Sequence, residues 1–331
     1  MDNVLVSIII PSLNQGDLIE NAILSVLKQK YQNWELLIQD GNSHDSTESI
    51  VSRYAVADAR ISFKKETDGG FADAVNKAMA RCRGTLIGIQ SSDDFYASGN
   101  VFSEAVAIYR QYPSAVMISG HSVLVDTGFR QVMAPFTPQE NGFIRPESIF
   151  TLKNHFAQGA TFFSRDRAQH VNGLRAEVDM VADTDLWVRL SNYHPVSTNS
   201  VFRTSQVWSC VTIHQNQRST NYHRFYLGRA RMAVAHYNDD NIRLDRNYKF
   251  KNAINLINIA YEYYCSIGED ASAIRTLYKD LTGETMAAAI SWEKLKDKIP
   301  FLRRLKEENL DHNSSMNKLV TYCSGYPLKW F

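Results

Sequence analysis

Residues 6–40 read VSIIIPSLNQGDLIENAILSVLKQKYQNWELLIQD. The stretch 4–10 is short, apolar and rich in β-branched residues, and it ends at Pro11, so it predicts a strand that is buried on both faces. Apolar residues then recur at helical spacing over 17–31, which predicts an amphipathic helix. A second apolar strand is predicted at Trp34–Ile38. This strand–helix–strand order is typical of a parallel pair joined by a right-handed crossover.

The same alternation continues along the next fifty residues. A helix is expected from near Ser46, a strand at Ile61–Phe63, a helix at Phe71–Arg81 and a strand at Thr85–Ile89. Three such units in series predict an α/β fold with a mostly parallel central sheet and helices on both faces.

Polar clusters follow three of the predicted strands. They read PSLN at 11–14, DGNS at 40–43 and SDD at 92–94. Because ligands bind outside the carboxyl ends of the strands in an open parallel sheet, we expect these clusters to form one site at one rim. A single cluster of this kind would be typical of an ordinary turn, so the prediction depends on the convergence of all three.

The second half of the chain has a different pattern. Shorter strands are predicted at Val116–Ser119, His121–Val125 and Ala160–Phe163, followed by a helix that contains 183–187. Strand signals end near Tyr222, and later helices are predicted at Ala253–Tyr264 and Ala271–Leu281. We expect a first domain over 1–225, made of the halves 1–115 and 116–225, and a helical C-terminal region over 226–331.

The composition is that of a soluble globular protein. The 331 residues include 36 Lys and Arg against 35 Asp and Glu, a net charge of +1, and 44% are hydrophobic. Balanced charge argues against a nucleic-acid partner and favours a small one. The N-terminus has no basic segment and its apolar run is broken at Pro11, so neither a secretory signal nor a spanning helix is predicted. A cytoplasmic location is expected.

Asp93 and Asp94 are adjacent acids directly after a predicted buried strand. Paired carboxylates repel each other unless a cation or hydrogen-bond donors compensate. Mg²⁺ or Mn²⁺ held by one or two carboxylates, water and substrate phosphate is the usual arrangement at diphosphate sites. The alternative is a solvated acidic pair at a helix start. The sequence contains neither the P-loop motif nor a G-x-G-x-x-G motif after the first strand, so a metal would have to hold the phosphates.

Residues 6–47 and 66–94 resemble the N-terminal half of the family-2 glycosyltransferases of the GT-A fold. The similarity is specific from about Val4 to Asp94. It resumes more weakly in QGATFFSR, NGLRAEVDMVADTDLWVRL and VTIHQNQRST, and it does not extend to the helical tail. The resemblance implies a Rossmann-like GT-A domain whose first half binds a nucleotide sugar and whose second half binds the acceptor. It also implies an enzyme that inverts the anomeric centre.

The resemblance also implies a set of nucleotide-sugar-binding residues. Pro11 and Ser12 would line the nucleotide pocket, and Asp40 would accept a hydrogen bond from uracil. Asp93 would reach the ribose hydroxyls or a metal-bound water. The complete set is Pro11, Ser12, Asn14, Asp40, Asp68, Asp73, Asn76 and Asp93, of which the residues from Asp68 to Asn76 would form the loop and helix under the nucleotide.

Asp94 is the first metal ligand that the resemblance implies. The motif reads Ser92-Asp93-Asp94 rather than the commoner Asp-any-Asp, so a further ligand is expected from elsewhere. His214, in a segment similar to a late histidine-containing strand end of the family, is the candidate, because imidazole suits Mn²⁺ better than Mg²⁺. Without the resemblance, a lone histidine is more often structural.

Asp183 matches the second acid of a pair in which the family usually has its general base. Ala182 replaces the first acid, which puts in doubt the acceptor contact that this residue would make. Asp185 is the alternative base. Without the resemblance, Asp183 reads as a helix cap, with Trp187 and Leu190 packing inward.

These observations predict an inverting glycosyltransferase that depends on Mn²⁺ or Mg²⁺ and moves a sugar from a UDP-sugar to a glycan, on a lipid-linked carrier at the inner face of the membrane. Basic and aromatic stretches at 299–302 and 327–331 would allow peripheral membrane contact. A helical subdomain or a homo-oligomer contact is the alternative for this tail. A non-catalytic nucleotide-sugar- or glycan-binding homologue and, more distantly, a sugar nucleotidyltransferase are the other classes considered.

Overall fold

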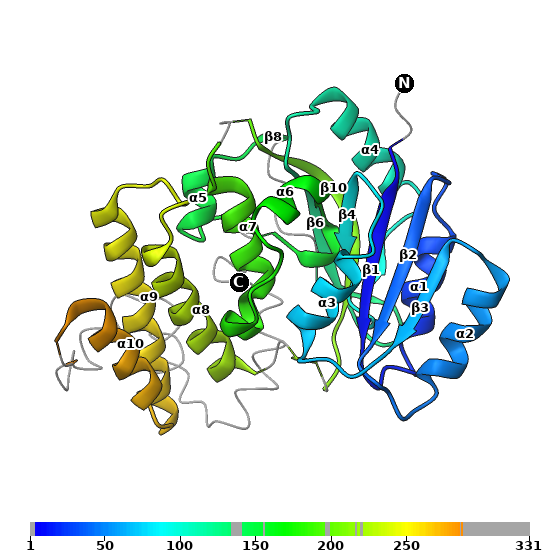
Figure 1. The fold of residues 1–331 in the computed structure, drawn as a ribbon. Coiled ribbons are helices and arrows are strands. Elements are labelled where there is room, and N and C mark those ends of the chain that lie inside the picture. The colour runs from blue at the N-terminus through cyan, green and yellow to red at the C-terminus, as the bar shows by residue number, and fades with distance from the viewer. Residues whose placement is uncertain are drawn as a thin grey trace. The chain divides into compact units, whose positions relative to one another are not determined.

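A computed structural model describes residues 4–133, 141–154, 156–195, 199–215, 217–218, 221–284 and 286 (Figure 1). The chain divides into two compact units. One consists of Met1–Thr220 with Asp240–Arg243, and the other of Asn221–Asp239 with Leu244–Phe331. The first unit contains the sheet, and the second is helical.

The first unit is built on a single mixed sheet. Its strand order is β3-β2-β1-β4-β9-β6-β10-β5, with β7 on β6 and β8 on β10. Strands β3, β2, β1 and β4 run parallel, whereas β9 runs antiparallel to both β4 and β6. The strands are β1 (Val6–Ser12), β2 (Trp34–Asp40), β3 (Ile61–Lys65), β4 (Leu86–Ile89), β5 (Phe95–Tyr96), β6 (Met117–Val125), β7 (Gln131–Met133), β8 (Gly142–Phe143), β9 (Thr161–Ser164) and β10 (Val201–Thr212).

Helices flank this sheet, as the predicted α/β fold requires (Figure 1). They are α1 (Ile19–Leu27), α2 (Thr47–Ala57), α3 (Phe71–Met79), α4 (Val101–Gln111), α5 (Pro146–Phe150), α6 (Arg165–His170) and α7 (Ala182–Asn192), with short 3₁₀ turns η1 (Gln158–Ala160) and η2 (Ala176–Val181). Each of the first three helices connects two parallel strands, so the fold class that the sequence predicts is confirmed.

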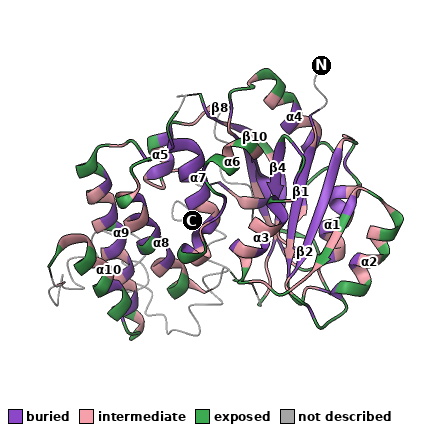
Figure 2. Cartoon of the chain, viewed as in Figure 1, coloured by how far each residue is buried: buried purple, intermediate pink, exposed green. Residues whose placement is uncertain are grey.

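The central strands form the core of the first unit. Ile8, Ile9 and Ile10 of β1 are fully buried, and so are Leu36 and Ile38 of β2. Figure 2 shows these strands as a continuous buried layer, whereas α2 turns one side to solvent. Helices that cover both faces of a parallel sheet remove the usual alternation of apolar and polar residues. This is why β1 reads as an uninterrupted apolar run.

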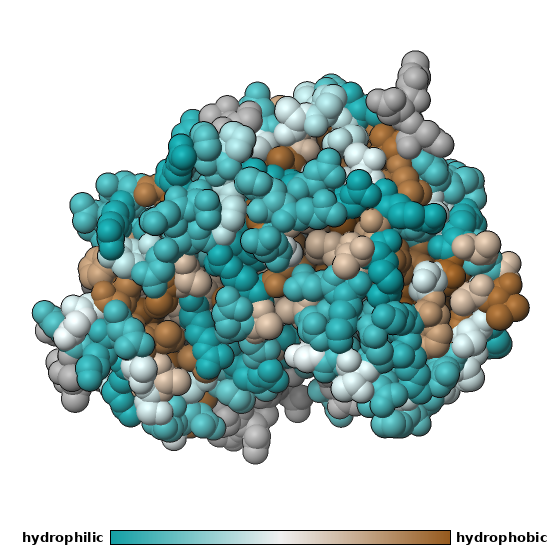
Figure 3. Space-filling view, viewed as in Figure 1, coloured by the Kyte–Doolittle hydropathy of each residue, from teal (hydrophilic) through white to brown (hydrophobic). Residues whose placement is uncertain are grey.

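The outer surface of the first unit is mainly hydrophilic on the face drawn in Figure 3, where hydrophobic residues lie in small patches. One such patch lies around α2, which carries Val56 at 89% exposure. Scattered exposed apolar side chains of this kind are normal for a folded protein.

Strand β6 differs from its prediction, and the sequence analysis did not predict β5, β7, β8 or β10. β6 is one strand that runs through Gly120, where a Cβ atom would lie 2.6 Å from the ring of Trp208. Glycine thus permits close contact between β6 and β10. The sequence pattern suggested a break between two strands at this position. β10 itself was not predicted, because buried polar residues such as Arg203 and Ser209 and two shifts of register obscure its pattern.

The second unit consists of α8 (Tyr222–Asn238), α9 (Arg246–Ile267) and α10 (Ser272–Thr282). The predicted helices at 253–264 and 271–281 are confirmed, and α8 was not predicted. Asp245 caps α9 by accepting a hydrogen bond from the Tyr248 N–H at 2.9 Å. None of the helices in the described ranges is long and apolar enough to cross a bilayer. The stretches 299–302 and 327–331 lie outside the described residues.

Glu35 ties together the rim of the sheet at the amino ends of β1, β2 and β4. Its Oε1 accepts hydrogen bonds from the Ser7 hydroxyl at 2.6 Å and from the Arg83 N–H at 2.7 Å. Its Oε2 accepts one from Arg83 Nε at 2.8 Å. Burial would raise the pKa of Glu35, but these donors outweigh it and hold the pKa below its ordinary value of 4.5. The carboxylate therefore stabilises the folded state.

We expect Glu35→Ala to lower the free energy of unfolding by about 2–3 kcal/mol at neutral pH, because Ser7 and Arg83 lose a buried acceptor. A carboxyl whose pKa falls on folding stabilises above its unfolded pKa and loses this effect as pH falls through the folded pKa. The difference between wild type and variant should therefore shrink below pH 4.5. Urea unfolding across this range measures it, with the exposed Glu48→Ala as control. A difference that is constant with pH would contradict the assignment.

Candidate active site

The carboxyl ends of β1 and β2 bring two of the predicted clusters side by side. Ser12 pairs with Asp40 in the parallel register, and the Gly41 N–H donates to the Ser12 carbonyl at 2.8 Å. The Asp40 carboxylate is fully buried. Its Oδ1 accepts from the Ser43 N–H at 2.7 Å and its Oδ2 from the Ser43 hydroxyl at 2.6 Å. Asp40 thus shapes the turn after β2.

The turn after β1 is bonded to the same serine. The Asn14 N–H donates to Ser43 Oγ at 2.7 Å, and the His44 N–H donates to Asn14 Oδ1 at 3.0 Å. Asn14 adopts a left-handed φ of 54°, a conformation that asparagine tolerates better than most residues. The buried Ser12 hydroxyl has no hydrogen-bond partner among the described residues. A polar atom of this kind at a rim is available to a ligand.

The loop before α3 lies against this rim. A Cβ atom on Gly41 would lie 2.9 Å from Asp68 Oδ2, so glycine permits the carboxylate to approach the turn after β2. Asp68 Oδ1 accepts from the Gly70 N–H at 2.8 Å. Asp73 turns back onto its own loop, because its Oδ2 accepts from the Gly69 N–H at 2.8 Å and pairs with Lys77 at 2.9 Å. These contacts lower the pKa of Asp73.

Asn76 is engaged elsewhere. Its Nδ2 donates to the Leu174 carbonyl at 2.8 Å, and its Oδ1 accepts from the Leu174 N–H at 2.9 Å. Both polar ends of the amide are therefore bonded to one backbone position 98 residues later. Asn76 thus links α3 to the segment before η2. Because both polar ends of its amide are engaged in this contact, the side chain is not oriented to bind a nucleotide.

The acidic turn between β4 and β5 meets the carboxyl end of β10. Asp94 is buried, and its Oδ1 accepts from the Thr212 N–H at 2.9 Å. Asp93 Oδ2 lies 2.9 Å from His214 Nε2. Burial, with the neighbouring Asp93 charge, raises the pKa of Asp94 well above its ordinary value of 3.8. The structure thus brings His214 to the acidic pair across 121 residues of sequence.

These side chains fit a divalent cation that takes further ligands from its substrate. A buried carboxylate beside a second acid gains most from a nearby positive charge. The described residues contain no group of three or more His, Cys, Asp or Glu side chains arranged to hold a metal by themselves. Mg²⁺ and Mn²⁺ sites commonly have few protein ligands, with phosphate and water in the other positions. Asp94, Asp93 and His214 are suited to this kind of site.

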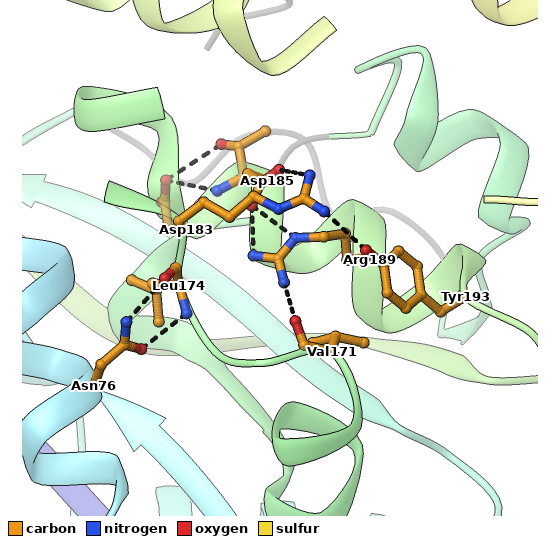
Figure 4. Close-up of polar contacts among 9 residues, drawn as sticks. Asn76, Val171, Leu174, Asp183, Asp185, Arg189 and Tyr193 are labelled. Carbon is orange, nitrogen blue, oxygen red and sulfur yellow. Dashed lines mark hydrogen bonds and ion pairs between the residues drawn. The ribbon is translucent and has the colours of Figure 1, made fainter. Parts of the chain in front are cut away.

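Asp183 and Asp185 stand in the first turn of α7 but face different surroundings (Figure 4). Residues two apart on an α-helix point about 200° apart, so both side chains cannot enter one site. Asp183 is partly exposed, and its Oδ1 accepts from the Thr184 N–H at 2.7 Å. Enclosure by the protein raises its pKa above the ordinary value of 3.8. Asp185 is fully buried and paired with Arg189.

Arg218 is a candidate site residue that the sequence analysis did not single out. Its Nη2 lies 2.9 Å from Asp179 Oδ1, and its guanidinium lies 5.1 Å from the ring centroid of Phe71 at the start of α3. Its charge also opposes the rise in the pKa of Asp183. Arg218 thus places a cation between the loop at 68–73 and the base candidate. The only signal in the sequence was its position four residues after His214.

The fold and this rim define an α/β domain with a polar, acidic site at the carboxyl ends of its parallel strands. Residues 7–171 match the model of glycosyl transferase family 2, and the chain belongs to this family.

Two of the similar proteins are bacterial glycosyltransferases. The chain is 32% identical over 146 residues to TuaG of Bacillus subtilis (strain 168), which is named for teichuronic acid biosynthesis, covering 44% of this chain and 54% of TuaG. It is 41% identical over 102 residues to the Escherichia coli UDP-Glc:alpha-D-GlcNAc-diphosphoundecaprenol beta-1,3-glucosyltransferase WfgD, covering 30% of this chain and 40% of WfgD. The chain thus spans about half the length of the curated relatives that it matches.

A solved structure supports the GT-A fold. S. aureus TarS 1–349 in complex with UDP-GlcNAc superimposes with a TM-score of 0.64 at 15% identity, covering 83% of this chain and 80% of that chain. At this level of identity, the similarity supports a shared fold and nothing further.

Proposed function

We propose that this protein transfers a sugar from a UDP-sugar to a glycan acceptor, with inversion at the anomeric carbon, in the synthesis of a bacterial polysaccharide. The observation that supports this most is the rim itself. An acidic pair in contact with a histidine lies at the end of β4, and a separate carboxylate of raised pKa begins α7. These are the groups that a leaving diphosphate and an attacking hydroxyl each need.

The nucleotide would occupy the rim of β1 and β2. Pro11, Ser12 and Asn14 would line its pocket, and the turn fixed by Asp40 would present the base-recognising edge. A carboxylate suits the N–H donor of uracil. WfgD acts on UDP-Glc by its name, which supports uridine as the nucleotide.

The diphosphate would lie over the acidic turn. Asp94 and His214 would hold a divalent cation, Mn²⁺ or Mg²⁺, and Asp93 would reach the ribose or a bound water. When bound, this cation acts as a Lewis acid that offsets the charge developing on UDP. Arg218 adds a positive side chain beside the loop at 68–73. This side chain would also stabilise the negative charge that develops on UDP.

Asp183 would act as the general base. The oxygen of the acceptor hydroxyl forms a bond to the anomeric carbon while the bond from that carbon to the diphosphate oxygen breaks. The hydroxyl proton passes to Asp183, and UDP leaves on the opposite face. A carboxylate with a raised pKa is a stronger base than an exposed aspartate, which favours proton transfer from the acceptor hydroxyl.

The acceptor would be a lipid-linked saccharide at the inner face of the membrane. WfgD extends a saccharide on a diphosphoundecaprenol carrier by its name, which supports this class. Ala182 leaves the position before the base without a carboxylate, so other groups would orient the acceptor hydroxyl.

Release of UDP tests the proposal. The full chain is incubated with a panel of UDP-sugars, with Mg²⁺ or Mn²⁺ or EDTA, and with or without undecaprenyl-diphosphate saccharides. We expect metal-dependent UDP release that the matching acceptor stimulates. A protein that binds UDP by calorimetry but releases none from any donor would be a non-catalytic binding homologue instead.

The role of Asp40 can be tested through the affinity for UDP. We expect Asp40→Ala to weaken UDP binding by about 10- to 100-fold, because both a uracil acceptor and the anchor of Ser43 are lost. Asp45→Ala is the matched control. Asp45 also accepts three hydrogen bonds in the same loop, from Gly16 and Thr47. Isothermal titration calorimetry of both variants with UDP distinguishes uracil binding from loop stability. Equal losses of UDP affinity would mean that Asp40 acts only by stabilising the loop.

A further inference from the structure

The segment between α6 and η2 makes a tight turn against α3. Asn172 and Gly173 both adopt left-handed backbone conformations, with φ values of 60° and 63°. A Cβ atom on Gly173 would lie 2.5 Å from Asn76 Oδ1, so a larger residue would displace the amide. Glycine therefore permits the backbone at 171–174 to lie directly on the side chain of Asn76.

This loop is held from two sides (Figure 4). From α3, Asn76 makes both of its hydrogen bonds to the backbone of Leu174, at 2.8 and 2.9 Å. From α7, Arg189 Nη1 donates to the Val171 carbonyl at 2.6 Å. The same guanidinium donates through Nε to Asp185 Oδ2 at 2.7 Å and also through Nη2. The loop 171–174 is thus hydrogen-bonded to both α3 and α7.

The contact between Arg189 of α7 and the loop lies in a buried, charge-paired environment. Asp185 and Arg189 are both fully buried, one helical turn apart. Arg175, at the end of the loop, places Nη1 3.7 Å from Asp185 Oδ1 and donates through Nη2 to the Tyr193 hydroxyl at 2.8 Å. A buried charge pair that also satisfies neighbouring polar groups fixes one geometry, because any displacement leaves a charge unpaired.

We propose that Asn76 and Arg189 are positioning residues for Asp183. They hold the loop 171–174 between α3, which follows the donor-side loop of Asp68, and α7, which carries the base two residues before Asp185. The loop therefore sets the distance between the bound donor and the base. This inference rests on the proposed function, and neither side chain needs to touch a substrate.

Kinetics of Asn76→Ala test the tie from α3. We expect kcat to fall by about 10- to 100-fold, because small displacements of a reacting group are costly, while UDP affinity and the donor KM stay within about twofold. Asn76→Asp, which keeps the bond from the Leu174 N–H and loses the one to its carbonyl, should lie between. If Asn76→Ala weakens UDP binding and leaves kcat unchanged, Asn76 is a nucleotide ligand and the proposal is wrong.

Asn192→Ala is the matched control. Asn192 is a buried asparagine of the same helix α7, and its amide donates to the carbonyls of Pro146 at 3.2 Å and Val188 at 3.0 Å. It lies at the end of the helix remote from Asp183. We expect this variant to lower Tm and to leave kcat within about twofold. An equal fall in kcat would mean that any loosening of α7 suffices, which would overturn the specific role.

Arg189→Lys tests the tie from α7 while keeping a positive charge opposite Asp185. An ammonium cannot reproduce the planar fork that bonds both Asp185 and Val171, so we expect a folded protein with reduced kcat and unchanged UDP affinity. Wild-type kcat in this variant would overturn the role of Arg189.

Hydrogen exchange provides a readout without turnover. We expect the amides of residues 171–185 in UDP-bound Asn76→Ala to exchange at least about 10-fold faster than in wild type, with no such change in Asn192→Ala. Exchange as slow as in wild type would overturn the coupling. A wild-type protein that releases no UDP from any donor would refute the transferase function, and this exchange measurement would still decide whether the loop couples the two helices.

Discussion

Asp183→Asn is expected to lower the rate of sugar transfer by about 10²- to 10⁴-fold while UDP binds as tightly as to the wild type. Asparagine keeps the shape of the side chain and the hydrogen bond from the Thr184 N–H, but it cannot take the proton of the acceptor hydroxyl. The measurement is UDP release at saturating donor and acceptor, together with calorimetric titration of UDP.

The pH profile adds a second readout for this variant. Because enclosure raises the pKa of Asp183, the acid limb of kcat/KM for the wild type should lie above pH 3.8 and disappear in Asp183→Asn. Asp166→Asn, at an exposed position of α6, serves as control and should behave as wild type. Full transfer by Asp183→Asn would assign the base to another residue. Asp185 would then be the next to test, although its pairing with Arg189 disfavours it.

Asp94→Asn is expected to remove metal-stimulated turnover, with a loss of about 10²-fold or more, because the amide is a poor ligand for a hard cation. The same change should raise the Tm of the ligand-free protein by a few degrees, on the order expected when a destabilised functional site is neutralised. The reason is that Asp94 is a buried carboxylate beside Asp93 whose pKa is raised by both burial and repulsion.

Thermal unfolding with and without Mn²⁺ and UDP measures both effects. Ligands that bind only the folded state raise Tm, so the wild type should gain stability from Mn²⁺ with UDP and Asp94→Asn should gain less. His214→Ala should show a smaller loss of metal response. An Asp94→Asn variant with unchanged Mn²⁺ dependence of UDP release would exclude Asp94 as a ligand.

Most of the first half of the fold could be predicted from local pattern. The parallel strands β1, β2 and β4 read as apolar runs because helices cover both of their faces, and each ends in a polar turn. β10 could not be predicted, because Arg203 and Ser209 are polar residues that become buried only through pairing with distant strands. Its carboxyl end carries His214, so the contact with Asp93 also depended on the tertiary structure.

The sequence by itself determined the series of βα units, the rim at which their polar turns meet and the family to which the chain belongs. These follow from patterns within short windows, where apolar periodicity and turn residues act locally. Only the tertiary structure decided that Asp185 faces Arg189 in the core, that Asn76 is bonded to Leu174 and that Arg218 lies beside Asp179. The contacts of Asn76 and Arg218 join residues 98 and 39 positions apart, so no local pattern records them. Asp183 and Asp185 have the same charge and nearly the same position in the chain, and packing around α7 gives them different surroundings.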